Sequence, residues 1–326
     1  MPVSKNEWYN MNEMVMNKWI WVTVLCLAVA ACVSGKSSKG QQVKGKAAAA
    51  LTAFPYPEVP AVMTEPEERL AYLVEHFWER YDFRDTVLLQ RREITEQGFA
   101  DFVGLLSQAQ DRALWQRAMK PFAEGAAETA EAYRCFGELA ELYLYDPNSP
   151  MRDEELFLAF AAEFMKQRVR DEGVYARLEF QRDLALKNRV GQAAADFRYV
   201  RADGKEGSLR STAKGKPLLL VFHDPDCVQC RETMAFLEES AVLAEAVKAG
   251  KVAVLAVYTE GYEEVWQAHK DELPAGWISA NDHAAVKTQL LYDLKAMPTL
   301  YLLDGEHRVA LKDAAPGAVL QAVGGL

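Results

Sequence analysis

The chain has 326 residues, of which 50% are hydrophobic and 26% are charged, and its formal net charge is -10. This length and hydrophobic content suffice for two ordinary domains, each with its own core. The acidic balance leaves no excess of basic residues for a phosphate backbone, so we expect no nucleic-acid partner.

The N-terminal segment has the features of an export signal. The run WIWVTVLCLAVAA at residues 19–31 carries no charge and follows Lys18. It is shorter than the roughly 20 apolar residues of a membrane span, and it fits the apolar core of a secretory signal. Small residues before Cys32 resemble a bacterial lipobox. We therefore expect a leader at residues 1–31 and lipid attachment at Cys32, which would anchor the protein to a lipid bilayer. A plain signal peptide, or a short buried helix with an incidental cysteine, is the alternative.

The start of translation and the membrane face stay open. Glu7 and Glu13 do not fit the positive start of a signal, so translation begins either at Met1 or, with a better signal, at Met16. Residues 32–60 are rich in Gly, Ser, Lys and Ala and then in Pro, which predicts a flexible linker. We expect a protein of a Gram-negative cell envelope that faces the periplasm, on the inner or the outer membrane.

Residues 61–189 show helical periodicity and predict an all-α domain. Thr64, two residues before Pro66, is expected to cap the first helix. Apolar residues then recur at helical spacing at Leu70, Leu73, Val74, Phe77 and Trp78. Further helices are expected at residues 95–108, 151–166 and 171–188, and another within residues 113–145 that breaks near Pro121 and Gly125. No cluster here has metal-ligand spacing, and Cys135 fits a small buried residue better than a reactive thiol.

From residue 190 the pattern changes to strands that alternate with helices. The apolar run LLLVF at residues 218–222 is typical of a strand buried on both faces. Other strands are expected at residues 252–258, 300–303 and 309–311, with a hairpin turn at Asp304-Gly305, and helices at residues 231–248, around 265–266, at 282–294 and at 316–323. Residues 190–326 therefore predict an α/β domain.

One pair of cysteines carries a chemical signal. Cys227, Val228, Gln229 and Cys230 lie between a buried strand and a helix. A cysteine at a helix N-terminus is stabilised as the thiolate, which is the nucleophile in disulfide exchange. The spacing places the second sulfur one turn further on. We expect Cys227 to attack a disulfide and Cys230 to resolve the mixed disulfide, with no cofactor beyond this redox-active pair.

A second motif, Met297-Pro298-Thr299, precedes a strand. We expect a cis Pro298 that faces the cysteines and exposes the backbone of Met297 to a substrate peptide. Met297 and Thr299, with three neighbours of the cysteines, are the expected substrate groove; those neighbours are Asp226, Val228 and Gln229.

A zinc site and a strong oxidant are the alternatives to a reducing pair. A zinc site needs more ligands than one CxxC provides, and no second CxxC or CxxH is present. Asp224 and Asp226 disfavour the Cys227 thiolate, whereas the helix dipole and any charge on His223 favour it. We expect the acids to dominate, which favours a reductase over a strong oxidant.

Residues 190–326 resemble the thioredoxin-like proteins of the TlpA/AhpC-TSA type, on the segments DPDCVQC, VLAVYTEGYEEVW and LLYDLKAMPTLYLLDGEHRV. Residues 55–190 are similar to a helical domain of unknown function in bacterial lipoproteins, on ERLAYLVEHFWERYDF and LYLYDPNSPMRDEELF. The resemblance implies an α/β thioredoxin-like fold after an all-α domain, with the opening strand at residues 191–197. It maps the redox pair to Cys227 and Cys230 and the cis-proline to Pro298.

Three positions depart from that family. Asp226 replaces the usual aromatic residue, Val228-Gln229 replaces Gly-Pro, and the usual buried acid would fall near the apolar Val221. The group that takes the proton from Cys230 is therefore open, and Glu260 is a weak candidate.

These observations predict a membrane-anchored thiol–disulfide oxidoreductase of the periplasm. Its partners would be a disulfide in a protein or a small molecule and an unknown electron donor. A peroxidase is a weaker alternative, since it expects Thr or Ser where Asp224 stands. The non-enzymatic alternative is a lipid-anchored binding or assembly module with a thioredoxin fold.

Overall fold

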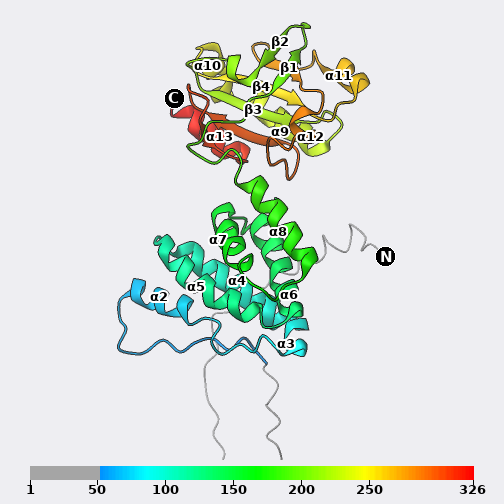
Figure 1. The fold of residues 1–326 in the computed structure, drawn as a ribbon. Coiled ribbons are helices and arrows are strands. Elements are labelled where there is room, and N and C mark those ends of the chain that lie inside the picture. The colour runs from blue at the N-terminus through cyan, green and yellow to red at the C-terminus, as the bar shows by residue number, and fades with distance from the viewer. Residues whose placement is uncertain (1–51) are drawn as a thin grey trace, which may run out of the picture. The chain divides into compact units, whose positions relative to one another are not determined.

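The structure, a computed structural model, describes residues 52–326 (Figure 1). The predicted leader, its two possible start residues, lipid attachment at Cys32 and most of the predicted linker lie outside these residues. Within the described part of the chain, no helix has both the length and the apolar character that a bilayer crossing needs.

The first part of the described chain is helical, as predicted. Its helices are α2 (Pro66–Glu75), α3 (Thr86–Gln90), α4 (Arg92–Gln108), α5 (Arg112–Ala126), α6 (Ala130–Ala140), the π-helix η2 (Glu141–Tyr145), α7 (Glu154–Phe164) and α8 (Glu172–Ala185). At the N-termini of five of these helices, the side-chain oxygen of the N-cap residue accepts hydrogen bonds from first-turn backbone amides. The five N-cap residues are Asp85, Asp111, Thr129, Asp153 and Asp171. These caps satisfy amides that have no partner inside the helix. We call this part the helical domain.

Aromatic rings fill the core of the helical domain. Phe122 stacks on Trp78 with ring centroids 4.8 Å apart, and Phe136 meets it edge-on at 5.1 Å. Rings from α4 and α7 close the cluster at Phe102, Phe160 and Phe164. All of these rings are buried, so they form a core rather than an exposed binding surface.

Two details of the helical prediction were wrong. Glu65, rather than Thr64, is the N-cap residue of α2, and the Thr64 hydroxyl lies 3.5 Å from the Glu65 carboxylate. The break predicted near Pro121 and Gly125 is present only at the second place, because Pro121 lies inside α5 and this helix ends at Ala126. Pro121 is exposed, as is Arg117 one turn earlier, so the carbonyl that loses its amide partner can bond water while the opposite face stays packed.

The second part is a sheet domain. Its strands are β1 (Arg198–Arg201), β2 (Glu206–Ser208), β3 (Leu218–His223), β4 (Ala253–Tyr258), β5 (Ile278–Asn281), β6 (Thr299–Leu303) and β7 (Val309–Leu311), in the order β2-β1-β5-β4-β3-β6-β7. β3 is an interior strand; it runs parallel to β4 and antiparallel to β6. Between the strands come the 3-10 helix η3 (Leu209–Ser211) and helices α9 (Val228–Glu238), α10 (Ala241–Lys248), α11 (Glu263–His269), α12 (Ala285–Thr288) and α13 (Pro316–Gly324).

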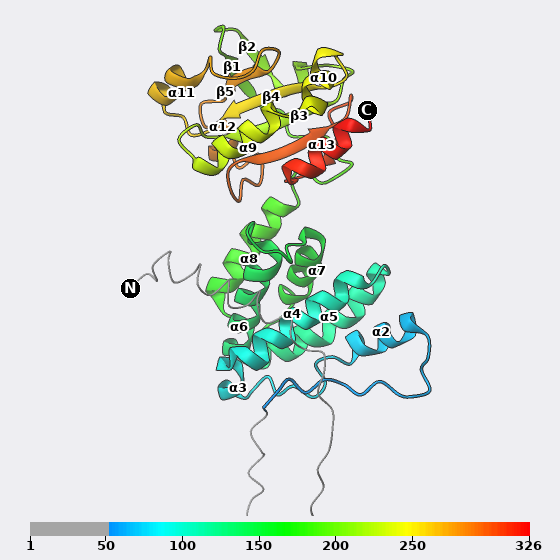
Figure 2. The same ribbon diagram turned by 180° about the vertical axis from the view of Figure 1, so that it is seen from behind.

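Each face of the central strands is covered. Helices α9, α10 and α13 pack on one face through Leu237, Leu243 and Val319 (Figure 2). The other face holds a second apolar cluster that includes Phe222, Tyr292 and Tyr301. Burial on both sides explains the continuous apolar run in β3.

The sheet domain differs from the sequence-based expectation at three places. Residues 231–248 form two helices, because Ser240 caps the second one. Only Ala285–Thr288 is helical within residues 282–294, where Ala284 and Leu290 have positive φ. Residues 191–197 hold only an isolated bridge at Ala193, and the first strand begins at Arg198; β2 and β5 were not predicted.

Candidate active site

A short loop carries the cysteine pair from β3 to α9. The Asp224 carbonyl accepts the Cys227 amide at 3.1 Å, and its carboxylate accepts the Asp226 amide at 3.1 Å. Cys227 is thereby the N-cap residue of α9, outside the helix but at its positive end. The helix-terminus placement predicted from the sequence is confirmed.

The two sulfurs have different surroundings. Cys227 is partly exposed, whereas Cys230 is 1% exposed; both are free thiols. Burial is the main cause that raises the pKa of Cys230 to about 12; the hydrogen bond with Cys227 acts in the same direction, and the Asp224 amide, 3.4 Å from the sulfur, opposes both. Cys230 therefore stays protonated near neutral pH, and Cys227 is the sulfur that a substrate can reach.

The Met-Pro motif lies beside the pair. β6 pairs with β3 so that Thr299 lies opposite Phe222, which brings the loop before β6 to the end of β3. The Met297–Pro298 bond is cis, as predicted, and the Met297 carbonyl accepts the Cys227 thiol at 3.7 Å. The structure therefore brings the CxxC motif and the Met-Pro motif into contact, as predicted.

The predicted groove residues divide into two groups. Asp226, Val228 and Gln229 are exposed around Cys227, and Met297 is half-buried. Thr299 is fully buried, and its hydroxyl donates to the Ala296 carbonyl at 2.6 Å. That bond makes Thr299 a support for the loop rather than part of its surface.

A cavity of about 210 Å³ lies behind Cys230. Its walls include three carboxylates and two histidines, most of which the sequence did not single out: Asp224, Glu238, Glu272, His223 and His269. Glu260, the weak candidate for the proton from Cys230, is not on this wall and forms an ion pair with Lys287. The end of β3, helix α9, the end of α11 and the loops after β3 and α11 together build the cavity, so no single local spacing identifies it.

His223, the last residue of β3, is a packed histidine. Burial lowers its pKa from 6.5 to about 4. Between these values the unfolded chain binds a proton that the folded protein does not, so stability falls as the pH falls from about 6.5 to 4 and is regained above 6.5. We expect a loss of about 3 kcal/mol over this interval.

Urea unfolding at pH 7 and at pH 4.5 measures this dependence. His223→Gln should remove most of the difference, whereas His76→Gln, in the more exposed pair with Glu79, should keep it. An unchanged pH dependence in His223→Gln would show that other groups cause it.

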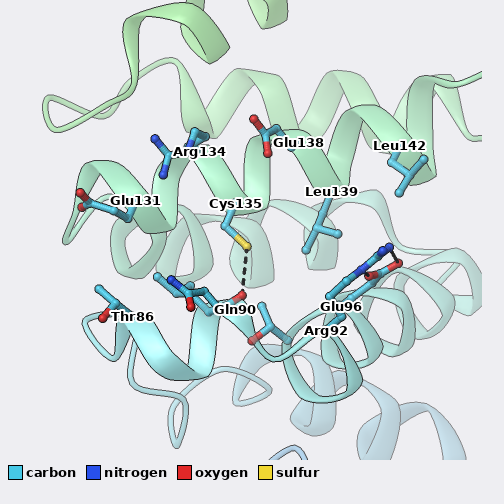
Figure 3. Close-up of a pocket in the computed structure, with 12 residues that line it drawn as sticks. Thr86, Gln90, Arg92, Glu96, Glu131, Arg134, Cys135, Glu138, Leu139 and Leu142 are labelled. Atoms are coloured by element: carbon cyan, nitrogen blue, oxygen red, sulfur yellow. Dashed lines mark hydrogen bonds and ion pairs between the residues drawn. The ribbon is translucent and has the colours of Figure 1, made fainter. Parts of the chain in front are cut away.

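Cys135 lies in a different cavity, of about 340 Å³, between α3, α4 and α6 (Figure 3). Its thiol points to the Leu89 carbonyl at 3.8 Å. Burial raises the pKa of Cys135 to about 11, so the thiolate is scarce near neutral pH. Cys135 is half-buried rather than fully buried, and its raised pKa agrees with the expectation that it is not a reactive thiol. Within residues 52–326, no group of three His, Cys, Asp or Glu side chains is placed to hold a metal ion.

The mixed sheet, the CxxC at the start of α9 and the opposing cis-proline define a thioredoxin-like domain. Two family models match the chain: a domain of unknown function, DUF5106, over residues 31–188, and the AhpC/TSA family over residues 190–312. No curated protein matches it.

Solved structures match one or both domains. A thioredoxin-like protein from Bacteroides caccae is 35% identical, with a TM-score of 0.76 over 84% of this chain and 98% of that one. The C-terminal domain of an uncharacterised Bacteroides fragilis protein is 34% identical over 42% of this chain and 97% of that one, with a TM-score of 0.40. The thioredoxin domain of a Bacteroides vulgatus thiol–disulfide oxidoreductase is 21% identical over 41% and 95%, with a TM-score of 0.36. The chain belongs to the thioredoxin-like proteins that join this helical domain to an AhpC/TSA domain.

Proposed function

We propose that the protein is a thiol–disulfide oxidoreductase that reduces disulfides in proteins or small molecules. The observation that carries this proposal is the asymmetry of the pair. Cys227 is accessible at the N-terminus of α9 beside the Met297 carbonyl, and Cys230 is buried as a thiol of raised pKa. An accessible nucleophile and a protected second thiol are the two parts that exchange requires.

The proposed reaction transfers two electrons to the substrate. The Cys227 thiolate attacks one sulfur of the substrate disulfide, forms a mixed disulfide and displaces the other sulfur as a thiolate. Cys230 then gives up its proton and attacks the Cys227 sulfur, which releases the second substrate thiol. The protein is left with a Cys227–Cys230 disulfide, and an external thiol donor must reduce it before the next cycle.

The exposed surface around Cys227 fits a polypeptide substrate. Val228 is 60% exposed next to the reactive sulfur, and the Met297 backbone lies on the other side of it. An extended peptide can pair with such a backbone edge while its disulfide meets Cys227.

We also infer that the protein works at the cell envelope. The leader at residues 1–31 and the small residues before Cys32 support export and lipid attachment. An oxidising periplasm is where substrate disulfides persist.

The direct test is reduction of insulin disulfides by dithiothreitol with and without the protein, together with the reduction potential of the pair. We expect catalysed reduction and a potential in the range of reducing thioredoxins, about -270 mV. Hydrogen peroxide consumption by the reduced protein without insulin reduction would favour the peroxidase. The absence of both activities would favour a non-enzymatic binding module.

A further inference from the structure

A chain segment of the sheet domain connects α12 to the cis-proline loop, and the helical domain holds it. This segment, residues 289–296, is followed by Met297, whose carbonyl accepts the Cys227 thiol. The described residues belong to a single compact unit that begins at Ala50, so both domains lie within it.

Charged side chains make the first set of contacts. The Tyr145 hydroxyl donates to both carboxylate oxygens of Asp293, at 3.0 and 3.1 Å. Lys295 Nζ lies 2.5 Å from Asp293 Oδ2, 3.5 Å from Glu154 Oε2 and 4.5 Å from the centre of the Tyr145 ring. Tyr145 and Glu154 belong to the helical domain, and the other two residues belong to the segment.

The centre of this cluster is buried from water, and Glu154 at its edge is 24% exposed. The side chains of Asp293 and Lys295 are 2% and 5% exposed. Glu154 also accepts a hydrogen bond at 2.8 Å from Lys312, whose buried Nζ donates to the carbonyls of Ala185 and Lys187 as well. Charges removed from water must keep their partners, so the cluster has one favourable arrangement.

Hydrogen bonds from side chains to backbone carbonyls hold the same segment at residues nearer its N-terminal end. The Asn188 side-chain amide donates to the Leu291 carbonyl at 2.8 Å, and the Lys187 ammonium donates to the Leu290 carbonyl. Both residues follow α8 in the connection between the domains. The segment is therefore tied to the helical side at four of its residues.

We propose that the helical domain positions the substrate-facing loop of the redox site through Tyr145 and Glu154. This inference rests on the proposed function. These two residues hold the segment at Asp293 and Lys295, and the Thr299 hydroxyl and Cys227 hold the next two residues, Ala296 and Met297. Tyr145 and Glu154 are positioning residues, because they act on a bound peptide only through the Met297 backbone.

Adjacent glutamates on α7 offer a matched test in the full chain. Glu154→Gln removes the charge that meets Lys295 and Lys312. Glu155→Gln makes the same change one residue later, where the partners are Arg112 and Arg189 and the segment is not touched. Both substitutions keep the size of the side chain. Tyr145→Phe is a milder second variant, because it removes only the hydrogen bonds to Asp293.

Hydrogen–deuterium exchange and insulin kinetics read out the effect. In Glu154→Gln we expect exchange in residues 289–297 to rise about tenfold and KM for insulin to rise about threefold to tenfold, with kcat nearly unchanged. Tyr145→Phe should shift both in the same direction. Glu155→Gln should leave both at the wild-type value, and iodoacetamide should alkylate Cys227 equally fast in all variants.

Two results would overturn the positioning role. One is wild-type exchange in residues 289–297 of both Glu154→Gln and Tyr145→Phe. The other is faster exchange without a change in KM. Failure of the proposed function is distinct: the wild-type protein would then reduce no insulin, whatever the exchange measurement shows.

Discussion

Replacement of Cys227 by serine should lower the rate of insulin reduction by at least about 1000-fold. A serine hydroxyl is not ionised near neutral pH and forms no disulfide, so the first step of exchange is lost. Cys230 does not substitute for it, because that thiol is buried and burial raises its pKa to about 12. The assay is dithiothreitol-driven insulin reduction with equal amounts of folded protein.

Two further variants make this prediction specific. Cys135→Ser should keep full activity, since Cys135 lies in the helical domain and its thiol faces the Leu89 carbonyl. Cys230→Ser should keep the first step and lose the second, so a mixed disulfide with the substrate should accumulate on Cys227 and appear on a non-reducing gel. Activity retained in Cys227→Ser would remove the basis of the proposed function.

Truncation of Phe122 to alanine should lower the free energy of unfolding by about 3–5 kcal/mol. The ring is fully buried and contacts aromatic rings from several helices, among them Trp78 at 4.8 Å and Phe136 at 5.1 Å. Its removal leaves a cavity that rigid neighbouring rings cannot fill. Urea unfolding followed by far-ultraviolet circular dichroism measures the loss.

Phe180→Ala is the matched control within the same domain. Phe180 lies on α8 with 52% of its surface exposed, so its truncation should change the unfolding free energy by less than about 0.5 kcal/mol. Equal losses in the two variants would mean that the aromatic cluster around Phe122 is not the core of the helical domain.

The positioning proposal gives the helical domain a part in the chemistry without a reactive group of its own. Among the described residues, its one cysteine is a shielded thiol. Its contribution is instead contact with the segment before Met297 through Tyr145 and Glu154. A loop held from outside the sheet domain loses less conformational freedom when a peptide binds, which favours affinity.

Local patterns were sufficient for most elements and for the reactive pair. The apolar run of β3, the CxxC before α9 and the Met-Pro before β6 each depend on neighbours in the chain, and the structure has all three where they were expected. Disulfide exchange requires cysteine, and a cis peptide bond essentially requires proline, so both can be recognised from residue type alone.

Contacts between segments that are distant in the chain could not be predicted from local sequence patterns. The burial of Cys230, the wall of the cavity behind it and the contact of Lys295 with Glu154 join residues far apart in the chain. The same holds for the course of α5 through Pro121, where packing of one face outweighs a local helix-breaking preference. Sequence spacing encodes which residues share a helix or a strand, whereas burial and charge pairing depend on which surfaces meet once the chain is folded.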